Sequence, residues 1–335
     1  MMSQGTGGAG GSGASGPDWV SEAGGASRTG GASEAGGAGE AGGTLVTVAA
    51  SGGRQLEVLA TGPEDGLPLV FHNGTPAGLV TFAPMIAAAA ERGLRTVMYA
   101  RPGYGGSTPQ PGRRVADAAG DVAAVMDALG AEQFVSAGWS GGGPHALATA
   151  ALLPERCRAA ASIAGVAPYG AAGLDWLAGM ARENVEEMSA AAAGEAELTA
   201  FLTTAAAELR DITGEQMIAG LGDLASPTDR AMLTGEFADY LAADFRASVR
   251  AGIAGWRDDD LAFIADWGFE PGTGAPAAVW QGGEDMMVPF AHGKWLAARL
   301  PKDRAHLLPG EGHLSLAVGQ FGEILDDLLS LAGVR

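Results

Sequence analysis

Cysteine is nearly absent from the 335-residue sequence, in which Cys157 stands alone. A single cysteine cannot form a disulfide within the chain, so a small secreted scaffold held together by disulfides is excluded. The N-terminus also lacks the basic segment and the continuous apolar segment of a secretory signal peptide. We therefore expect the protein to reside in the reducing cytoplasm.

Basic residues and long apolar runs are also scarce. Lysine and arginine number 20 against 39 aspartates and glutamates, which gives a formal net charge of -19, and the longest basic run is Arg113-Arg114. Such a chain has no positive patch with which to attract a nucleic acid or an anionic membrane surface. No stretch of 18 or more apolar residues is present that would span a bilayer. The sequence therefore predicts no nucleic-acid or membrane partner, and it leaves the oligomeric state open.

Glycine is abundant, with 55 residues in the chain and 16 of them within residues 1–43. That segment has too few apolar side chains to offset the entropy of ordering it, so we predict a disordered Gly/Ala/Ser-rich tail. Apolar and β-branched residues begin to alternate at Thr44, where we place the start of the folded unit. With 47% hydrophobic residues, the chain can build a large core.

Short apolar runs alternate with stretches of helical periodicity along the rest of the chain. This alternation is typical of an α/β fold, in which a mostly parallel sheet carries helices on both faces. Eight strands are expected, at residues 45–49, 56–60, 67–72, 96–100, 133–138, 160–166, 277–281 and 306–308. Helices are expected at residues 79–92, 115–129, 142–153, 293–300 and 314–331. The first two strands are expected to form a hairpin, because only a short glycine-containing turn separates them.

The alternation stops between residues 169 and 267, where the chain is rich in alanine, methionine and aromatic residues and shows only helical periodicity. We predict that residues 169–267 form a helical lid, inserted into a core made of residues 44–168 and 268–335. The aromatic and methionine side chains of this lid either form a core of their own or line a pocket beneath it.

The sequence Gly138-Trp139-Ser140-Gly141-Gly142 contains the best candidate for a catalytic nucleophile, Ser140. The Gly-x-Ser-x-Gly spacing alone occurs readily by chance in so glycine-rich a chain. Its context is more informative, because the motif follows an apolar strand and precedes a helix, as in a nucleophile elbow. In so tight a turn, side chains at the outer glycines would collide with neighbouring backbone, and the N–H of Gly141 can stabilise negative charge. The alternative is an ordinary glycine-rich turn with an incidental serine.

A serine nucleophile needs a base to take its proton, and the base needs a carboxylate to orient it. Asp285 follows the strand expected at 277–281, and His313 follows the strand expected at 306–308. We therefore predict Asp285 as the acid and His313 as the base, in the chain order nucleophile, acid, histidine. Glu284 is the alternative acid, since only one of two adjacent side chains can face the site.

Three other histidines are weaker candidates for the base. His145 lies in the helix after the nucleophile, His292 begins a surface helix, and His306 lies inside a strand, so each is expected to be structural. The acidic run at 258–260 is expected to be a solvated helix face. No cluster of histidine and cysteine has the spacing of a metal site, so neither a metal nor an organic cofactor is predicted.

A second donor for an oxyanion is expected in the loop after the third strand, Asn73-Gly74-Thr75-Pro76, whose backbone N–H groups are free. Thr75 is the leading donor, because Pro76 has no N–H to donate. We expect Gly74 and Trp139 to contact the substrate. The alternative is an ordinary glycine-proline turn.

Together these motifs resemble those of the α/β-hydrolase superfamily, in the lid-bearing branch that includes proline iminopeptidase-like and esterase-like members. The sequence Arg-Pro-Gly-Tyr-Gly-Gly-Ser at 101–107 is similar to the superfamily's Arg-Pro-Gly-x-Gly-x-Ser loop, and Asp-Met-Met-Val-Pro at 285–289 is similar to its acid turn. The resemblance covers about residues 44–335 and implies the α/β-hydrolase fold. Two positions depart from the pattern: Ala100 replaces an aspartate, and Asn73-Gly74 replaces a His-Gly pair.

These residues predict a serine hydrolase acting on a small molecule. His313 would deprotonate Ser140, which would attack a carboxyl ester, amide or thioester to form an acyl-enzyme. The N–H groups of Gly141 and Thr75 would hold the oxyanion, and Asp285 would orient the histidine. The Ala-, Met- and aromatic-rich lid favours a carboxylesterase-type enzyme with a moderately apolar substrate.

Other functions remain open at this stage. An aminopeptidase would need lid carboxylates for the ammonium group of its substrate, and Glu183, Glu186 and Glu187 are candidates, although their helical spacing is more typical of a solvated face. An acyltransferase would differ only in the nucleophile that reaches the acyl-enzyme. A ligand-binding module without turnover is disfavoured by the complete triad. Serine at the nucleophile position disfavours haloalkane dehalogenase and epoxide hydrolase chemistry, for which this superfamily uses aspartate.

Overall fold

The structure is a computed structural model that describes residues 43–221, 224–300 and 304–334. Residues 1–42, which make up almost all of the predicted tail, lie outside these ranges. The described chain begins with β1, whose first residue is Gly43, one residue before the predicted start of the folded unit.

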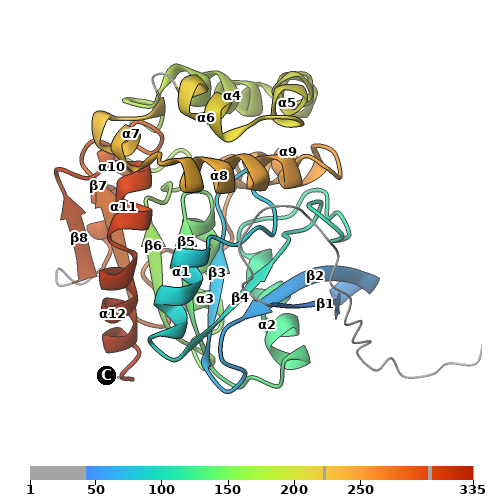
Figure 1. Ribbon diagram of the computed structural model, residues 1–335, viewed down its shortest axis with the longest axis vertical. Helices are drawn as coiled ribbons and strands as arrows, with labels where there is room; N and C mark the ends of the chain where they lie inside the picture. The colour runs from blue at the N-terminus through green and yellow to red at the C-terminus, as the bar shows by residue number, and fades with distance from the viewer. Residues whose placement is uncertain (1–42, 222–223, 301–303, 335) are drawn as a thin grey trace, which may run out of the picture.

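An eight-stranded sheet forms the centre of the described chain, with the strand order β1-β2-β4-β3-β5-β6-β7-β8 (Figure 1). The strands are β1 (Gly43–Ala50), β2 (Arg54–Thr61), β3 (Leu67–His72), β4 (Leu94–Tyr99), β5 (Phe134–Trp139), β6 (Cys157–Ile163), β7 (Ala277–Gly282) and β8 (Ala305–Leu308). Among the described strands, only the pairs β1–β2 and β2–β4 are antiparallel. The predicted mostly parallel eight-stranded sheet is therefore confirmed.

The ends of the strands differ little from the prediction. The hairpin of β1 and β2 turns through a short 3-10 segment, η1 (Ser51–Gly53), as expected. The sixth strand is shifted: β6 begins at Cys157 and ends at Ile163, instead of spanning 160–166. It ends early because Ala164 adopts a positive φ of 49°, which takes the chain out of the sheet.

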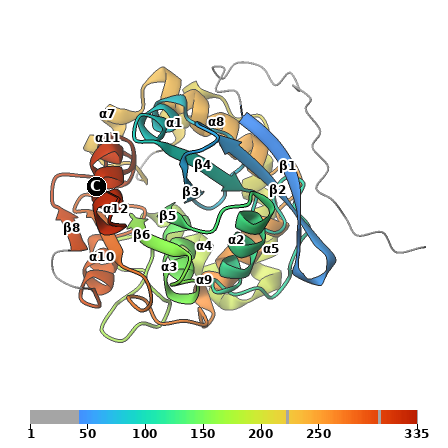
Figure 2. The same ribbon diagram turned by 90° about the horizontal axis from the view of Figure 1, so that it is seen from below.

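Helices cover both faces of the sheet, as Figure 2 shows from below. On one face lie α1 (Ala83–Ala90) and α12 (Phe321–Leu331), and on the other lie α2 (Asp117–Ala128), α3 (Gly142–Leu152) and α10 (Phe290–Ala297). Successive side chains of a strand point to opposite faces. Leu69 and Phe71 of β3 accordingly join the core beneath α1 and α12, whereas Val70 joins the core beneath α2 and α3.

The C-terminal helix predicted over 314–331 is two helices. α11 (His313–Gly319) and α12 meet at Gln320, whose φ of -99° and ψ of 4° are not those of an α-helix. The prediction of one helix was wrong because the apolar periodicity continues across this turn. The break lets α11 pack against α7 and β7 while α12 packs against β6 and β7 on the face of the sheet.

Residues 164–276, which we call the helical insertion, connect β6 to β7 in sequence, and the helices within them lie above the sheet in Figure 1. Its helices are α4 (Arg182–Ala193), α5 (Glu195–Leu209), α6 (Gly214–Gly220), α7 (Pro227–Met232), α8 (Gly235–Ser248) and α9 (Ala254–Ile264). The segment predicted as a lid, residues 169–267, contains these helices. Within the ranges that the structure describes, no helix is long and apolar enough to cross a membrane.

Candidate active site

Ser140 lies in the tight turn between β5 and α3. Its φ of 56° is a left-handed backbone conformation, which is strained for a residue with a side chain. Two hydrogen bonds hold the turn: the Ser140 N–H donates to Ile163 O at 2.8 Å, and the Gly143 N–H donates to Ser140 O at 2.9 Å. A side chain at Gly138 would collide with the backbone of Gly142, so this close approach requires glycine. The local geometry is that of a nucleophile elbow.

His313 and Asp285 form a buried pair, with 2.8 Å between Nδ1 and Oδ2. The carboxylate is held in the turn after β7, where its Oδ1 accepts the N–H groups of Met287 at 2.9 Å and Val288 at 2.8 Å. Gln281 Nε2 donates to Oδ2 at 3.1 Å. These bonds fix the carboxylate, and through it the orientation of the imidazole.

The surroundings of His313 favour its protonated form. Burial alone would lower the pKa of His313, but the charge and hydrogen bond of Asp285, together with the charge of Asp229, raise it above the ordinary value. The neighbouring Glu284, the alternative acid, is exposed and accepts a hydrogen bond from Thr228 Oγ1 at 2.6 Å. The partner of His313 is therefore Asp285.

Ser140 and His313 line the same cavity, which is open to solvent. Within the described residues no hydrogen bond joins the Ser140 hydroxyl to His313. Asp285 engages Nδ1 of the ring, so Nε2 is the nitrogen that can take the serine proton. The ring of Trp139 packs against His313 with 5.6 Å between the centroids.

The walls of the cavity come from both the core and the helical insertion. Gly74, Thr75 and Trp139 contribute from the core. The insertion supplies mainly apolar side chains from α6, α8 and the chain between them, which are Met217, Leu221, Tyr240, Leu241 and Phe245. Five cavity residues of the core, Gly74, Thr75, Trp139, Ser140 and His313, are site residues predicted from the sequence, whereas Ala77, Met287 and Leu314 are not, and for the cover only its general composition was predicted.

The two predicted oxyanion donors lie close together beside Ser140. A side chain at Gly141 would collide with the side chain of Thr75, and a Cβ at Gly74 would lie 3.5 Å from the Cβ of Ser140. Gly141 is the N-cap of α3, where N–H groups have no acceptor within the helix. Its carbonyl oxygen is engaged by His145 Nδ1 at 2.9 Å. Two backbone N–H groups in this position can stabilise a developing oxyanion.

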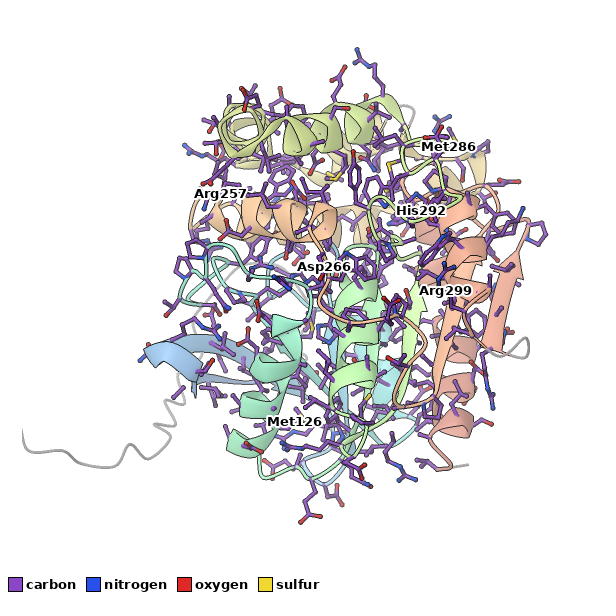
Figure 3. The ribbon with its side chains drawn as sticks, turned by 180° about the vertical axis from the view of Figure 1, so that it is seen from behind. Met126, Arg257, Asp266, Met286, His292 and Arg299 are labelled. Atoms are coloured by element: carbon purple, nitrogen blue, oxygen red, sulfur yellow. The ribbon has the colours of Figure 1, made fainter. Side chains whose placement is uncertain are left out.

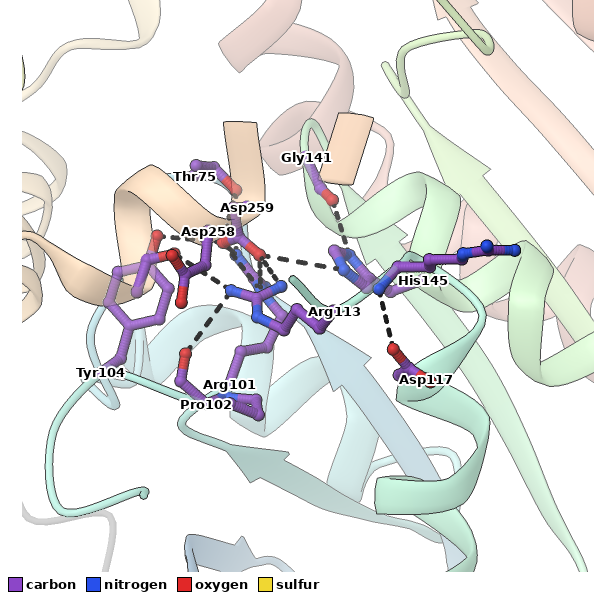
Figure 4. A network of polar contacts seen from close by, with 12 residues as sticks. Thr75, Arg101, Pro102, Tyr104, Arg113, Asp117, Gly141, His145, Asp258 and Asp259 are labelled. Carbon is purple, nitrogen blue, oxygen red and sulfur yellow. Dashed lines mark hydrogen bonds and ion pairs between the residues drawn. The ribbon is translucent and has the colours of Figure 1, made fainter. Parts of the chain in front are cut away.

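A buried ionic network lies beneath Thr75 (Figure 4). Asp259 of α9 pairs with Arg101 through Oδ2 at 2.7 Å and with Arg113 through Oδ1 at 2.7 Å. Asp259 Oδ2 also accepts hydrogen bonds from Thr75 Oγ1 at 3.0 Å and Tyr104 Oη at 2.9 Å. Burial alone would raise the pKa of Asp259, but the two guanidinium groups hold it well below its ordinary value. Asp259 is therefore a permanent anion that anchors the side chain of Thr75.

Arg101 extends this network to the backbone of the oxyanion loop, donating to Asn73 O at 2.7 Å and to Gly74 O at 2.6 Å. Asp259 and its two neighbours, Asp258 and Asp260, are all buried, so the prediction of a solvated face at 258–260 was wrong. Arg101 and Arg113 compensate the charge of Asp259, and Arg257 bonds to Asp258 Oδ1 at 2.8 Å. Burial and the neighbouring Glu187 raise the pKa of Asp260, which favours its neutral form.

The other histidines predicted to be structural lie outside the cavity. His145 is buried against Gly141, and His306 of β8 stacks on Trp280 with 3.8 Å between centroids. His292 is also fully buried, on α10 (Figure 3). Its Nε2 donates to the carbonyl oxygen of Trp176 at 2.8 Å, so its ring lies on the buried side of α10, a helix whose opposite side exposes Ala291 and Lys294. No group of three His, Cys, Asp or Glu side chains in the described part of the chain is arranged to hold a metal ion.

Asp244 of α8 is a cavity residue that sequence reasoning missed. Its Oδ1 accepts the N–H groups of Gly78 at 3.0 Å and Val80 at 3.3 Å, and burial raises the pKa of the carboxyl to about 7. A sequence signal existed, because an acid four residues after Tyr240 interrupts the apolar face of a helix.

The lid carboxylates considered from the sequence lie elsewhere. The described residues that line the cavity do not include Glu183, Glu186 or Glu187. Glu186 is exposed, and Glu187 accepts a hydrogen bond from Trp256 Nε1 at 2.6 Å. The carboxylate available to a ligand in the cavity is therefore that of Asp244.

Comparison with known proteins agrees with this architecture. The family model described as the alpha/beta hydrolase fold matches residues 68–320, and the chain belongs to this family. It is similar to a non-heme chloroperoxidase of Streptomyces lividans, 35% identical over 124 residues, which are 36% of this chain and 45% of the relative. It is also similar to epoxide hydrolase B of Mycobacterium tuberculosis, 33% identical over 133 residues, which are 38% and 36% of the two chains. The chain spans less than half the length of either relative.

Solved structures are similar over most of the chain. A bromoperoxidase from Bacillus anthracis has a TM-score of 0.63 and 20% identity, covering 86% of this chain and 99% of its own. The enol-lactonase from Burkholderia xenovorans has a TM-score of 0.57 and 22% identity, covering 85% and 99%. At these identities the likeness concerns the fold.

Proposed function

We propose that the chain is a carboxylesterase-type serine hydrolase, which cleaves a carboxyl ester, amide or thioester of a moderately apolar small molecule. One observation carries this proposal: a serine in strained elbow geometry and a histidine paired with a buried aspartate line a single cavity. Neither residue type alone supports nucleophilic catalysis, because a serine needs the base and the base needs its orienting acid.

The reaction would proceed through an acyl-enzyme. His313 Nε2 takes the proton of the Ser140 hydroxyl as Oγ attacks the carbonyl carbon, and the carbonyl oxygen becomes an oxyanion. The N–H groups of Gly141 and Thr75 stabilise that charge. As the bond to the leaving alcohol, amine or thiol breaks, the leaving group receives the proton from His313. Water then gives a proton to His313 and attacks the acyl carbon, and as the bond from that carbon to Ser140 Oγ breaks, His313 returns the proton to Oγ and the carboxylic acid is released.

The network beneath the oxyanion loop supports this mechanism. An oxyanion hole is effective when its donors are held in place before the reaction, so that no reorganisation is needed as charge develops. Thr75 is held by Asp259 through its side chain, and the preceding carbonyl groups are held by Arg101. The loop therefore has the rigidity that the proposed role requires.

The serine at position 140 favours this chemistry over epoxide hydrolysis, despite the partial similarity to epoxide hydrolase B. The epoxide hydrolases of this superfamily use an aspartate as the nucleophile, whereas this chain has a serine, Ser140, at that position of the turn. The substrate preference follows from the cavity, whose cover from α6 and α8 is mainly apolar.

A second candidate function is an aminopeptidase, and Asp244 is the observation that favours it. This carboxyl group lines the cavity that contains Ser140, where it would pair with the ammonium group of a substrate. Aminoacyl arylamides should then be cleaved faster than arylamides of matched apolar acids, and Asp244→Asn should abolish that preference. Esters of apolar acids cleaved faster than any aminoacyl compound would favour the esterase.

Labelling with a fluorophosphonate probe tests the serine hydrolase itself. The wild-type protein should be labelled, and Ser140→Ala should not be. Ser136→Ala is a matched control, because Ser136 is a fully buried serine of β5 outside the cavity lining. Absence of label on the wild type, or equal labelling of Ser140→Ala, would contradict the proposal. Esters of graded acyl length would then define the substrate class.

A further inference from the structure

A short helix of the insertion, α7, contacts the loop that carries His313. Both carboxylate oxygens of Asp229 are used: Oδ2 accepts the N–H of His313 at 3.0 Å, and Oδ1 accepts the N–H groups of Leu314 at 2.7 Å and Ser315 at 2.9 Å. Asp229 is fully buried, and Ser226 Oγ accepts its N–H at 3.2 Å. The first turn of α11 is thus bonded to a carboxylate that lies 84 residues earlier in the chain.

The same helix also contacts the turn that carries Asp285. Thr228, the residue before Asp229, donates its hydroxyl proton to Glu284 Oε2 at 2.6 Å. Glu284 immediately precedes Asp285. Adjacent residues of α7 therefore bond to the acid turn and to the histidine loop.

Gly312 provides independent support for the importance of this contact. Its φ of -98° and ψ of -155° are extended backbone that any residue adopts, so the conformation does not require glycine. A Cβ on Gly312 would nevertheless lie 2.5 Å from the carboxyl carbon of Asp229. The space for a side chain before His313 is taken by a carboxylate of the insertion.

We propose that Asp229 is a positioning residue for the reaction: it holds the backbone of His313 in place and favours the imidazolium that forms when Ser140 loses its proton. This inference rests on the proposed function. Asp229 does not line the cavity among the described residues, so it acts through His313. Because α7 belongs to the insertion, the insertion contributes to the catalytic machinery as well as covering the cavity.

The electrostatic part of this role follows from the groups that face His313. Asp285 on the turn after β7 and Asp229 on α7 are the charged groups that raise the pKa of His313, and the packed ring of Trp139 is uncharged. Asp285 acts at Nδ1, whereas Asp229 acts at the backbone N–H. The two contributions can therefore be removed one at a time.

Asp229→Asn is the first test, because it keeps the size of the side chain and removes its charge. We expect kcat for an activated ester to fall roughly tenfold, the size of losing a hydrogen bond to a charged group, with little change in KM. The midpoint of the acid limb of kcat/KM should move to lower pH. Asp127→Asn removes an exposed surface charge and should leave that midpoint in place. A wild-type profile, or a lower kcat with an unmoved midpoint, would overturn the proposal.

A second test measures the contact between Gly312 and the Asp229 carboxylate. It compares four proteins, so its result does not depend on the folding of any single variant. Gly312→Ala is made in the wild type and in Asp229→Ala, and Tm and kcat are measured for all four proteins. In the wild type the new methyl group collides with the carboxylate, so both quantities should fall. In Asp229→Ala the methyl group enters vacated space and should cost little. Equal losses in the two backgrounds would overturn the assigned contact.

The outcomes also separate this inference from the proposed function. If the wild type hydrolyses no ester and Ser140 is not labelled, the serine hydrolase proposal fails. The Tm values of the four proteins with and without Gly312→Ala and Asp229→Ala do not change that conclusion. If the wild type is active and labelled but Asp229→Asn matches it in kcat and in pH profile, only the role of Asp229 fails.

Discussion

Replacement of Asp259 by asparagine should destabilise the protein more than any surface charge change. Asparagine keeps the shape of the side chain but leaves the guanidinium groups of Arg101 and Arg113 without their counter-charge, and these side chains are only 5% and 3% exposed. Breaking a buried ion pair by removing one partner costs about 3–5 kcal/mol. A loss of 1 kcal/mol shifts Tm by roughly 2–4 °C in chains of 150–250 residues and by about the lower value in this longer chain, so Tm should fall by roughly 6–10 °C.

Calorimetry measures this loss, and Asp266→Asn is the matched control. Asp266 pairs with Arg114 at 3.6 Å, and both side chains are largely exposed, so its replacement should leave Tm unchanged. Asp259→Asn should also lower kcat, because Thr75 loses the carboxylate that accepts its hydroxyl hydrogen bond. An Asp259→Asn protein with wild-type Tm would refute the reasoning that this carboxylate is held as a compensating anion.

Three further predictions concern titratable groups of the site. Asp285→Asn should lower kcat roughly 10⁴-fold, as expected when a histidine loses its orienting carboxylate, and full activity of this variant would show that another acid serves His313. Because the pKa of His313 is raised, activity should be lost on acidification with a midpoint above the ordinary 6.5, measurable from kcat/KM against pH. For Asp244, burial raises the folded-state pKa from 3.8 to about 7, so the folded state holds a proton that the unfolded state releases. The free energy of unfolding should therefore fall as pH rises from about 4 to about 7, and urea unfolding of Asp244→Asn should lack this fall.

The strands and the elbow could be predicted because their determinants are local. β3, β5 and β7 are short, mostly buried apolar runs, and each ends within three residues of a candidate site residue. Since the carboxyl ends of parallel strands meet at one edge of a sheet, Ser140 and Asp285 were expected near each other without any knowledge of distances.

Other parts of the site could not be predicted, because they depend on residues far apart in the chain. The burial of Asp259 requires Arg101 and Arg113, which lie 158 and 146 residues earlier. An argument from hydrophobic periodicity predicts that an acidic residue is exposed, because the pattern does not show whether a guanidinium group from a distant part of the chain lies beside it. Asp229 was missed for the same reason, since its carboxylate oxygens accept backbone N–H groups that lie 84 to 86 residues later in the chain.

The bond between Thr75 and Asp259 has a consequence for exchanging the insertion between members of the family. The insertion is one continuous piece of chain between β6 and β7, which suggests that it can be exchanged as a module for the corresponding piece of another family member. Such a graft would remove the anion that neutralises Arg101 and Arg113, and with it the anchor of the oxyanion loop. A replacement insertion therefore needs an acidic residue at the position of Asp259. This requirement limits which insertions evolution or a protein engineer can combine with this core.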